Sequence, residues 1–263
     1  MCGIAGYSLK PDARIDRTLA AQALLAGIAE RGADAVGYAH RAVGGSVSVH
    51  KRRSGASALL SDLTVPDESV EVLLHVRDYT KGLPTIPANN HPVRHGHVVG
   101  VHNGIILNDE EIFAEHGFER AASRMTVDSE AIFALAELTD SRPKALEQLR
   151  GSMAAAWIDE RRDDRVYCAR GVGRPLWVGE GKHATFFAST GLALEVVEHY
   201  TGVTLRRRKI DEGTLLVLND GRVVKQKRFK PQRNFEERSL PAVRAPSEGQ
   251  FCLERLATLA AAA

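Results

Sequence analysis

Cysteine is scarce in this sequence, and no two cysteines lie close together along the chain. The three that occur, Cys2, Cys168 and Cys252, lie far apart, and no Cys-x-x-Cys motif is present. Such motifs bind zinc or act as redox dithiols, so neither kind of site is predicted. An odd number of distant cysteines fits a reducing compartment.

An excess of charge of one sign is also missing. The 35 lysines and arginines are nearly balanced by 33 aspartates and glutamates, which leaves a formal net charge of +2. This balance gives no global electrostatic case for binding nucleic acid or an anionic membrane. Small-molecule chemistry is the expectation that remains.

Long apolar runs and phosphate-binding loops are missing as well. No segment approaches the roughly 18 apolar residues of a membrane span, and no basic stretch followed by an apolar core opens the chain. We therefore expect no signal peptide, no membrane segment and a cytoplasmic protein. Neither a Walker-type glycine loop nor a Ser-Gly-Gly-x-Asp-Ser loop occurs, and no cofactor is predicted.

The sequence does contain enough apolar residues for a substantial core, since 44% of its 263 residues are hydrophobic. Residues 4–9 predict a strand, and Asp16 opens a helical pattern that runs to Ile28. Residues 36–40 and 46–50 alternate across Gly44-Gly45, which predicts a hairpin.

The middle of the chain predicts strands separated by loops and helices. A strand at 70–76 leads into Arg77 and an irregular loop at 78–92. A strand at 97–101 delivers residues 102–104 into a turn, a helix starts near 108, and Asp128 caps a helix that ends at Leu138. Pro143 is expected in the first turn of a third helix.

From Met153 onward the pattern changes to short strands with turn signals, interrupted by one helix at 192–200. The strands are expected at 154–159, 166–170, 176–178, 185–188, 214–218 and 223–228. Hairpins in place of strict strand-helix alternation predict an α+β fold, a four-layer αββα sandwich of two stacked, mainly antiparallel sheets. Residues 229–250 predict a charged wrapping or flexible tail, and residues 251–263 a short helix that docks on the domain or on a partner chain.

Cys2 directly follows the initiator methionine. If Met1 is removed, Cys2 carries both a nucleophilic sulfur and an α-amine with a pKa of about 7.7 to 8.0, which can accept the thiol proton. The alternative is that Cys2 is a small buried hydrophobic residue at the start of a strand.

Several motifs, taken together with Cys2, resemble a known family. They are Met1-Cys2-Gly3-Ile4, Arg31-Gly32-Ala33-Asp34-Ala35-Val36-Gly37, residues 75–82, Asn89-Asn90-His91-Pro92, residues 101–106, residues 126–130, Arg174-Pro175-Leu176 and Phe187-Ala188-Ser189. In this order and spacing they resemble the class II glutamine amidotransferases, amino-terminal nucleophile hydrolases, and above all the glutaminase domain of glucosamine-6-phosphate synthase. The likeness covers about residues 2–220, so we expect a glutaminase domain at 2–228 followed by the tail at 229–263.

The resemblance implies roles for individual residues. Cys2 is the nucleophile, and the side-chain amide of Asn103 and the N–H of Gly104 stabilise the oxyanion. Arg77 suits the α-carboxylate of glutamine and Asp128 its α-ammonium. Taken alone, the Asn103-Gly104 dipeptide favours an ordinary turn, Arg77 a surface ion pair and Asp128 a helix cap.

Two further positions, Thr80 and His91, match family residues that line the glutamine pocket, although local hydrogen bonding is an alternative for both. Two positions depart from the pattern: Asp78 stands where the synthase has tryptophan, and Lys81 where it has histidine. A charged loop leaves another γ-glutamyl amide open as the substrate.

Three functions remain open. The first is a glutaminase that passes ammonia to a separate synthase, because the residues after 220 are too few for a synthase module. The second is a stand-alone hydrolase of a small γ-glutamyl amide, and the third is a non-catalytic binding module. L-glutamine or a related amide is the expected ligand, and homo-oligomerisation is left open.

Overall fold

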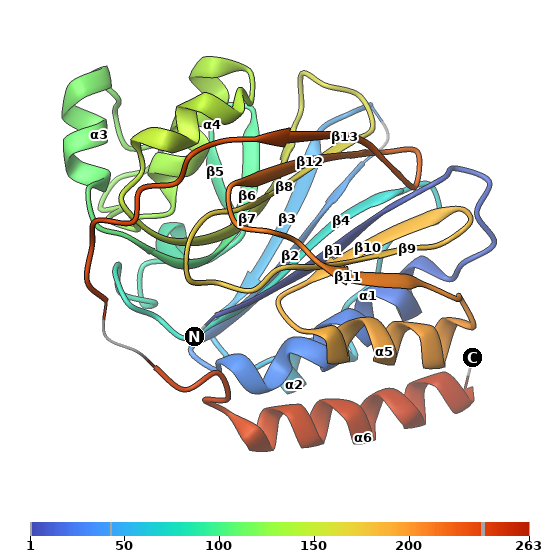
Figure 1. Ribbon diagram of the computed structural model, residues 1–263. Coiled ribbons are helices and arrows are strands. Elements are labelled where there is room, and N and C mark those ends of the chain that lie inside the picture. Colours follow the sequence, from blue (N-terminus) through green and yellow to red (C-terminus); the bar gives the residue numbers. More distant parts are fainter. Residues whose placement is uncertain (1, 43, 238–239, 263) are drawn as a thin grey trace.

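The computed structural model describes residues 2–42, 44–237 and 240–262, and within these ranges it has two antiparallel sheets with helices outside each (Figure 1). The predicted α+β, four-layer αββα sandwich is confirmed. The first sheet has seven strands, in the order β11 (Arg206–Lys209), β9 (Trp177–Glu180), β10 (Ala184–Ala188), β1 (Gly3–Leu9), β4 (Glu71–Arg77), β2 (Ala35–Arg41) and β3 (Val47–Arg52).

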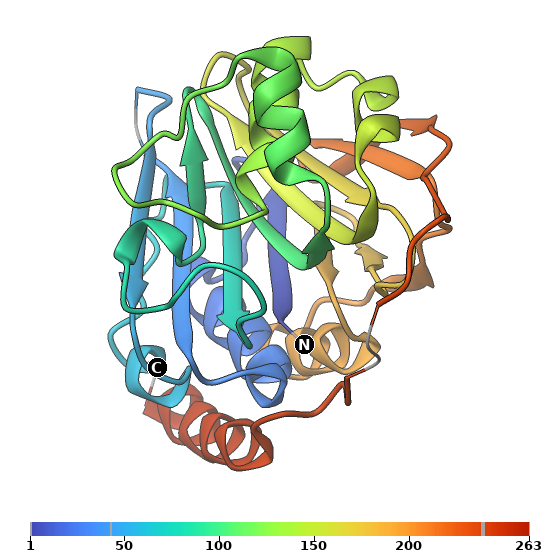
Figure 2. The same ribbon diagram turned by 90° about the vertical axis from the view of Figure 1, so that its left-hand side faces the viewer.

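The second sheet, within the same described ranges, has six strands. Their order is β13 (Arg222–Arg228), β12 (Thr214–Asn219), β8 (Arg165–Arg170), β7 (Gly151–Asp159), β6 (Val98–Ile106) and β5 (Val93–His95). Helices α3 (Asp109–His116) and α4 (Glu130–Thr139) and the 3₁₀ segment η3 (Pro143–Gln148) belong to this side (Figure 2). On the other side lie α1 (Arg17–Ile28), η1 (Ala29–Arg31), α2 (Ser57–Leu60), α5 (Gly191–Thr201) and α6 (Pro246–Ala262).

Alternation along the buried strands builds the layers. In β1, Ala5, Tyr7 and Leu9 join the apolar cluster under α1 and α5, whereas Ile4 points between the sheets and joins Val101 there. All seven residues of β1 are buried, because helices cover one face and the second sheet covers the other. The residue that precedes β1 is therefore held at the edge of a rigid sandwich.

Local signals located several elements correctly. Asp16 caps α1 by accepting a hydrogen bond from the N–H of Leu19 at 2.8 Å, as the sequence predicted. Gly44 and Gly45 have φ of 90° and 88° in the turn between β2 and β3. Residue 43 of this hairpin lies outside the described residues.

Two predictions about the site's surroundings were wrong. Residues 102–104 lie inside β6 and not in a turn, because β7 is long enough to pair with them, Asn103 with Ala154 and Gly104 with Met153. Asp128 does not cap α4, since Ser129 is the N-cap residue and makes no side-chain cap. The carboxylate of Asp128 instead accepts a hydrogen bond from the N–H of Ile106 at 2.7 Å.

The C-terminal segment docks on its own domain. Helix α6 packs beside α1, with Cys252 and Leu256 fully buried in the same apolar cluster (Figure 1). Described residues of the tail bond to the domain, the N–H of Lys230 to Glu147 and the N–H of Arg244 to the backbone oxygen of Glu30. Across the described part of the chain, no helix is both long and apolar enough to traverse a bilayer.

Candidate active site

Cys2 lies at the open end of β1, beside the end of β4. The register pairs Gly3 with Val76, which places Cys2 next to the chain that leaves β4 through Arg77. The Cys2 thiol donates to the backbone oxygen of Asp78, with Sγ 3.4 Å from that atom. Burial raises the pKa of the thiol, although this hydrogen bond and Arg77 act in the opposite direction. A thiol kept neutral in this way needs a base before it can attack.

The Arg31-Gly32-Ala33-Asp34 segment contacts the backbone on which this nucleophile lies. Arg31 donates from Nε to the backbone oxygen of Cys2 at 2.8 Å. Gly32 packs so closely that a Cβ there would stand 2.4 Å from the carbonyl carbon of Arg77. The carboxylate of Asp34 accepts from the N–H of Tyr79 at 2.9 Å. In the sequence this segment is recognisable only as a family motif, because supporting contacts between distant residues leave no local signal.

Asn103 is fully buried, and neither amide atom of its side chain has a hydrogen-bond partner within the described residues. An unpaired buried amide is costly, so its retention indicates a ligand that uses it. The next residue, Gly104, has φ of 146°, and a Cβ there would lie 2.0 Å from the backbone oxygen of Ser152. Only glycine fits this position.

A histidine pair joins the two sheets at this end of the sandwich. His75 of β4 donates from Nε2 to the backbone oxygen of His102 in β6, at 3.0 Å. Burial lowers the pKa of both rings to about 3, so both are neutral at physiological pH. This bond lies two residues before Arg77 and one residue before Asn103. Cys2, Arg77 and Asn103 are therefore gathered at one end of the sandwich.

Arg77 is buried and holds the loop that follows β4. Its Nη1 donates to Oδ1 of Asn90, and its Nη2 donates to the backbone oxygens of Lys81, at 2.9 Å, and Gly82. A guanidinium has five N–H donors, so these three bonds leave capacity for a ligand. The predicted contact with an α-carboxylate stays a prediction, and the structure adds a loop-holding role that the sequence did not indicate.

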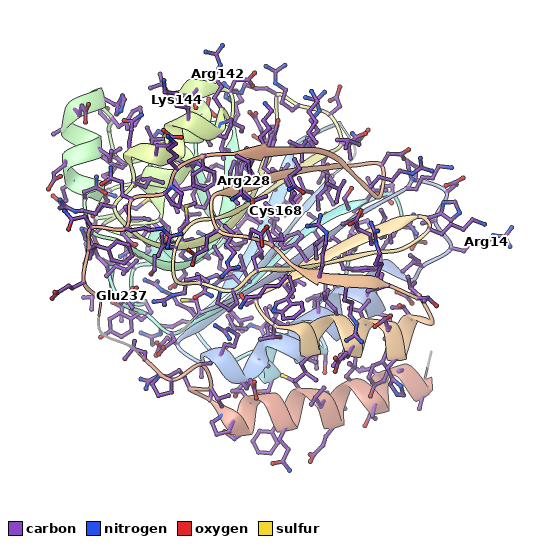
Figure 3. All side chains as sticks on the ribbon, viewed as in Figure 1. Arg14, Arg142, Lys144, Cys168, Arg228 and Glu237 are labelled. Carbon is purple, nitrogen blue, oxygen red and sulfur yellow. The ribbon has the colours of Figure 1, made fainter. Side chains whose placement is uncertain are left out.

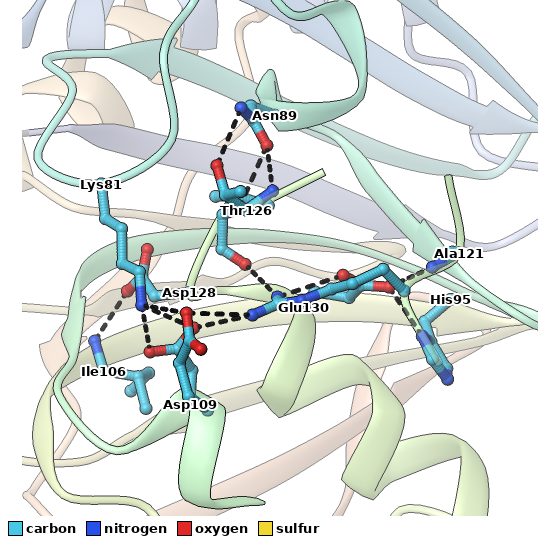
Figure 4. Close-up of polar contacts among 12 residues, drawn as sticks. Lys81, Asn89, His95, Ile106, Asp109, Ala121, Thr126, Asp128 and Glu130 are labelled. Carbon is cyan, nitrogen blue, oxygen red and sulfur yellow. Dashed lines mark hydrogen bonds and ion pairs between the residues drawn. The ribbon is translucent and has the colours of Figure 1, made fainter. Parts of the chain in front are cut away.

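The 78–92 loop places the remaining predicted pocket residues differently. Thr80 is exposed, whereas His91 is buried and stacks on His75 with ring centroids 4.1 Å apart. Neither ring nitrogen of His91 has a partner among the described residues, and burial holds its pKa well below the ordinary value. Lys81 leaves the loop to bind both carboxylate oxygens of Asp109, at 2.7 and 2.9 Å (Figure 4).

Asp128 lies buried beside this ion pair (Figure 4). Its bond to the N–H of Ile106 places it near Gly104, two residues earlier in β6. Burial raises the pKa of this carboxyl to about 6, and the nearby negative charge of Asp109 adds to that effect. The carboxylate is thus ionised at neutral pH and protonated in mild acid.

This pKa predicts how glutamine affinity depends on pH if Asp128 binds the α-ammonium. Protonation below about pH 6 removes the charge, so the Kd should rise about tenfold between pH 7 and pH 5. Calorimetric titration of glutamine into Cys2→Ala protein measures binding without turnover. Asp128→Asn should bind more weakly at pH 7 and show no such rise. An equal pH dependence in both proteins would contradict the anchor role.

The other two cysteines are poor candidates for the nucleophile. Cys168 lies in the interior between the sheets, where burial raises its pKa well above the ordinary value (Figure 3). Cys252 lies on the buried face of α6, and burial raises its pKa to about 12. Of the three cysteines, only Cys2 lies at the end of a strand, and the positively charged Arg77 is nearby.

Comparison with known proteins agrees with this geometry. The family model described as "Glutamine amidotransferase domain" matches residues 83–196. Glutamine–fructose-6-phosphate aminotransferase (isomerizing) of Pseudomonas putida is 34% identical over 213 residues, 75% of this chain and 33% of that protein. The same enzyme of Escherichia coli K12 is 32% identical over 207 residues, 74% and 32% of the two chains. The chain belongs to the class II glutamine amidotransferases.

Solved structures show the same fold. Glutamine phosphoribosylpyrophosphate amidotransferase from B. subtilis superimposes with a TM-score of 0.65 at 21% identity, covering 86% of this chain and 49% of that chain. The allosteric regulatory enzyme of purine biosynthesis gives a TM-score of 0.68 at 22% identity, covering 89% of this chain and 50% of that chain. This chain spans about a third of the length of the curated relatives that it matches. The predicted family and fold are confirmed.

Proposed function

We propose that this chain hydrolyses the γ-amide of L-glutamine to glutamate and ammonia, and that a separate synthase subunit in the cytoplasm consumes the ammonia. The partnerless amide of Asn103, buried at the end of the sandwich that carries Cys2, is the observation that carries the proposal. Family membership supports the choice of glutamine. The catalytic and binding roles of the individual residues are part of this proposal.

The reaction proceeds through a thioester. The α-amine of Cys2, free once Met1 is removed, takes the thiol proton, and the sulfur attacks the γ-carbonyl carbon. Met1 itself lies outside the described residues. The side-chain N–H of Asn103 and the backbone N–H of Gly104 stabilise the oxyanion. The amide nitrogen leaves as ammonia with a proton from the α-amine, and water then releases glutamate.

Two charged side chains bind the α-carboxylate and the α-ammonium of glutamine. Arg77 pairs with the α-carboxylate through donors that the loop leaves free, and Asp128 binds the α-ammonium. Because both contacts exist in the ground state and in the transition state, they act mainly on substrate affinity and position.

A substrate that lacks the α-carboxylate tests the anchor role of Arg77. Wild-type protein should strongly prefer glutamine to this analogue, and Arg77→Ala should lose most of that preference while raising the KM for glutamine. The ratio of the two kcat/KM values in each protein is the measurement. Asn90→Ala is the matched control: it removes one of the three bonds by which Arg77 holds the loop but keeps the guanidinium, so it should retain the preference. The same ratio in wild type and Arg77→Ala would mean that the pocket does not recognise a γ-glutamyl end through this arginine.

A second candidate function is a stand-alone hydrolase of a small γ-glutamyl amide. The loop supports it, because Lys81 is tied to Asp109 while Tyr79 and Leu83 stay exposed at the surface. Exposed side chains of this kind could contact a substituent on the amide nitrogen of a larger γ-glutamyl amide. A kcat/KM for a bulky γ-glutamyl amide above that for glutamine would favour this function.

A further inference from the structure

The C-terminal segment touches both backbone supports of Cys2. Immediately before α6, the N–H groups of Arg244 and Ala245 both donate to the backbone oxygen of Glu30, at 2.9 and 2.8 Å. Glu30 directly precedes Arg31, which holds the carbonyl of Cys2. Figures 1 and 2 show this part of the chain passing the amino-terminal end of the molecule as it enters α6.

The second contact is an ion pair to the residue whose backbone oxygen accepts the hydrogen bond from the Cys2 thiol. Arg244 Nε lies 3.2 Å from Oδ2 of Asp78, the residue whose backbone oxygen accepts the hydrogen bond from Cys2. Adjacent tail residues thus reach both sides of the nucleophile. In the synthase pattern that the sequence resembles, a tryptophan stands at this position, and it could not form this pair.

The remainder of the segment is firmly attached to the domain. The carboxylate of Glu248 accepts hydrogen bonds from the N–H and the hydroxyl of Ser57, at 2.9 and 3.0 Å. A Cβ on Gly249 would lie 2.9 Å from Cβ of Glu30, so the first turn of α6 packs directly on the support of Cys2. Buried Cys252 and Leu256 complete the attachment.

We propose that residues 244–262 are part of the catalytic unit, and that Arg244 is a positioning residue that acts on Cys2 through Asp78. This inference rests on the proposed role of Cys2 as nucleophile. It unites two parts that the sequence separated, the domain at 2–228 and the tail at 229–263. The tail supplies no reacting group. It fixes the backbone on which the thiol rests.

The test compares alkylation of Cys2 by iodoacetamide in wild type, Arg244→Ala and Arg255→Ala, followed by peptide mass spectrometry. Arg255, which lies within α6 and far along the chain from Arg244, donates from Nε to the hydroxyl of Ser61 at 2.8 Å and serves as the matched control. Arg244 is 41% exposed and Asp78 16%, so the ion pair is partly screened by solvent. Its loss should loosen Asp78, expose the thiol and speed alkylation about two- to five-fold.

Arg255→Ala should react at the wild-type rate, and Arg244→Lys should restore most of the protection. Asp78→Asn should speed alkylation at least as much as Arg244→Ala, and adding Arg244→Ala to Asp78→Asn should give no further increase, because Arg244 acts through Asp78. In glutamine hydrolysis, Arg244→Ala should lower kcat more than it raises KM.

Equal alkylation rates in Arg244→Ala and Arg255→Ala would overturn the proposal. Concurrent labelling of Cys252 in Arg244→Ala would also overturn it, because Arg244 would then be holding α6 and not the nucleophile. Alkylation needs no substrate, so a protein that fails to hydrolyse glutamine would refute the proposed function while this comparison still decides the role of Arg244.

Discussion

Replacing Cys2 by serine should reduce glutamine hydrolysis by roughly 10³-fold or more, while glutamine binding is kept. A hydroxyl is a far poorer nucleophile than a thiol at neutral pH. The change of one atom preserves the shape of the site, so Arg77 and Asp128 should still bind the substrate. Steady-state ammonia release measures the first expectation, and calorimetry with glutamine measures the second.

Matched substitutions at the other cysteines separate chemistry from packing. Cys168→Ser and Cys252→Ser each place a hydroxyl in a buried apolar site, so they should lower the free energy of unfolding but leave kcat near the wild-type value. If Cys168→Ser abolished hydrolysis in folded protein and Cys2→Ser did not, the nucleophile would have been assigned to the wrong residue.

Replacing Asn103 by alanine should lower kcat by about 10²- to 10³-fold with little change in KM. This is the usual effect of removing one oxyanion donor, because the donor acts mainly in the transition state. The buried amide makes no hydrogen bond within the described part of the protein, so its removal also removes the cost of an unpaired polar group, and the free energy of unfolding should not fall. Kinetics and thermal unfolding of the same preparation test both expectations.

Asn108 offers the matched control, because it is a buried asparagine that is fully partnered. Its Nδ2 donates to the backbone oxygen of Gln148, and its Oδ1 accepts from the N–H of Arg150, at 2.9 and 2.8 Å. Asn108→Ala should therefore destabilise the protein by about 1–3 kcal/mol and spare kcat. The opposite pattern, with Asn103→Ala destabilised and active, would make Asn103 a structural residue.

The sequence predicted those features that local signals determine. Asp16 caps a helix within its own turn, Gly44-Gly45 turns a hairpin, and a short apolar run predicted the strand at 4–9. Motif order was sufficient for the family and therefore for the layered fold. These features depend on residues that are close in sequence or on a pattern that the whole family shares.

The features that were missed depend on distant partners. Residues 102–104 look like a turn until β7 is available to pair with them, and Asp128 looks like a helix cap until Ile106 lies beside it. Strand β11 (Arg206–Lys209) was not predicted, because a run of four basic residues shows no apolar alternation. The ion pair between Arg244 and Asp78 joins the two parts into which the sequence was divided, and no local pattern announces it.

The central claim is that Cys2, as the first residue of the mature chain, carries the γ-glutamyl group during turnover. Acid quenching of the protein during glutamine hydrolysis, followed by intact-mass and peptide mass spectrometry, tests this claim directly. The account predicts a chain without Met1 and an adduct of one glutamyl group on Cys2, lost when hydroxylamine cleaves the thioester. An active chain that retains Met1, or an adduct found on Cys168 and not on Cys2, would contradict it.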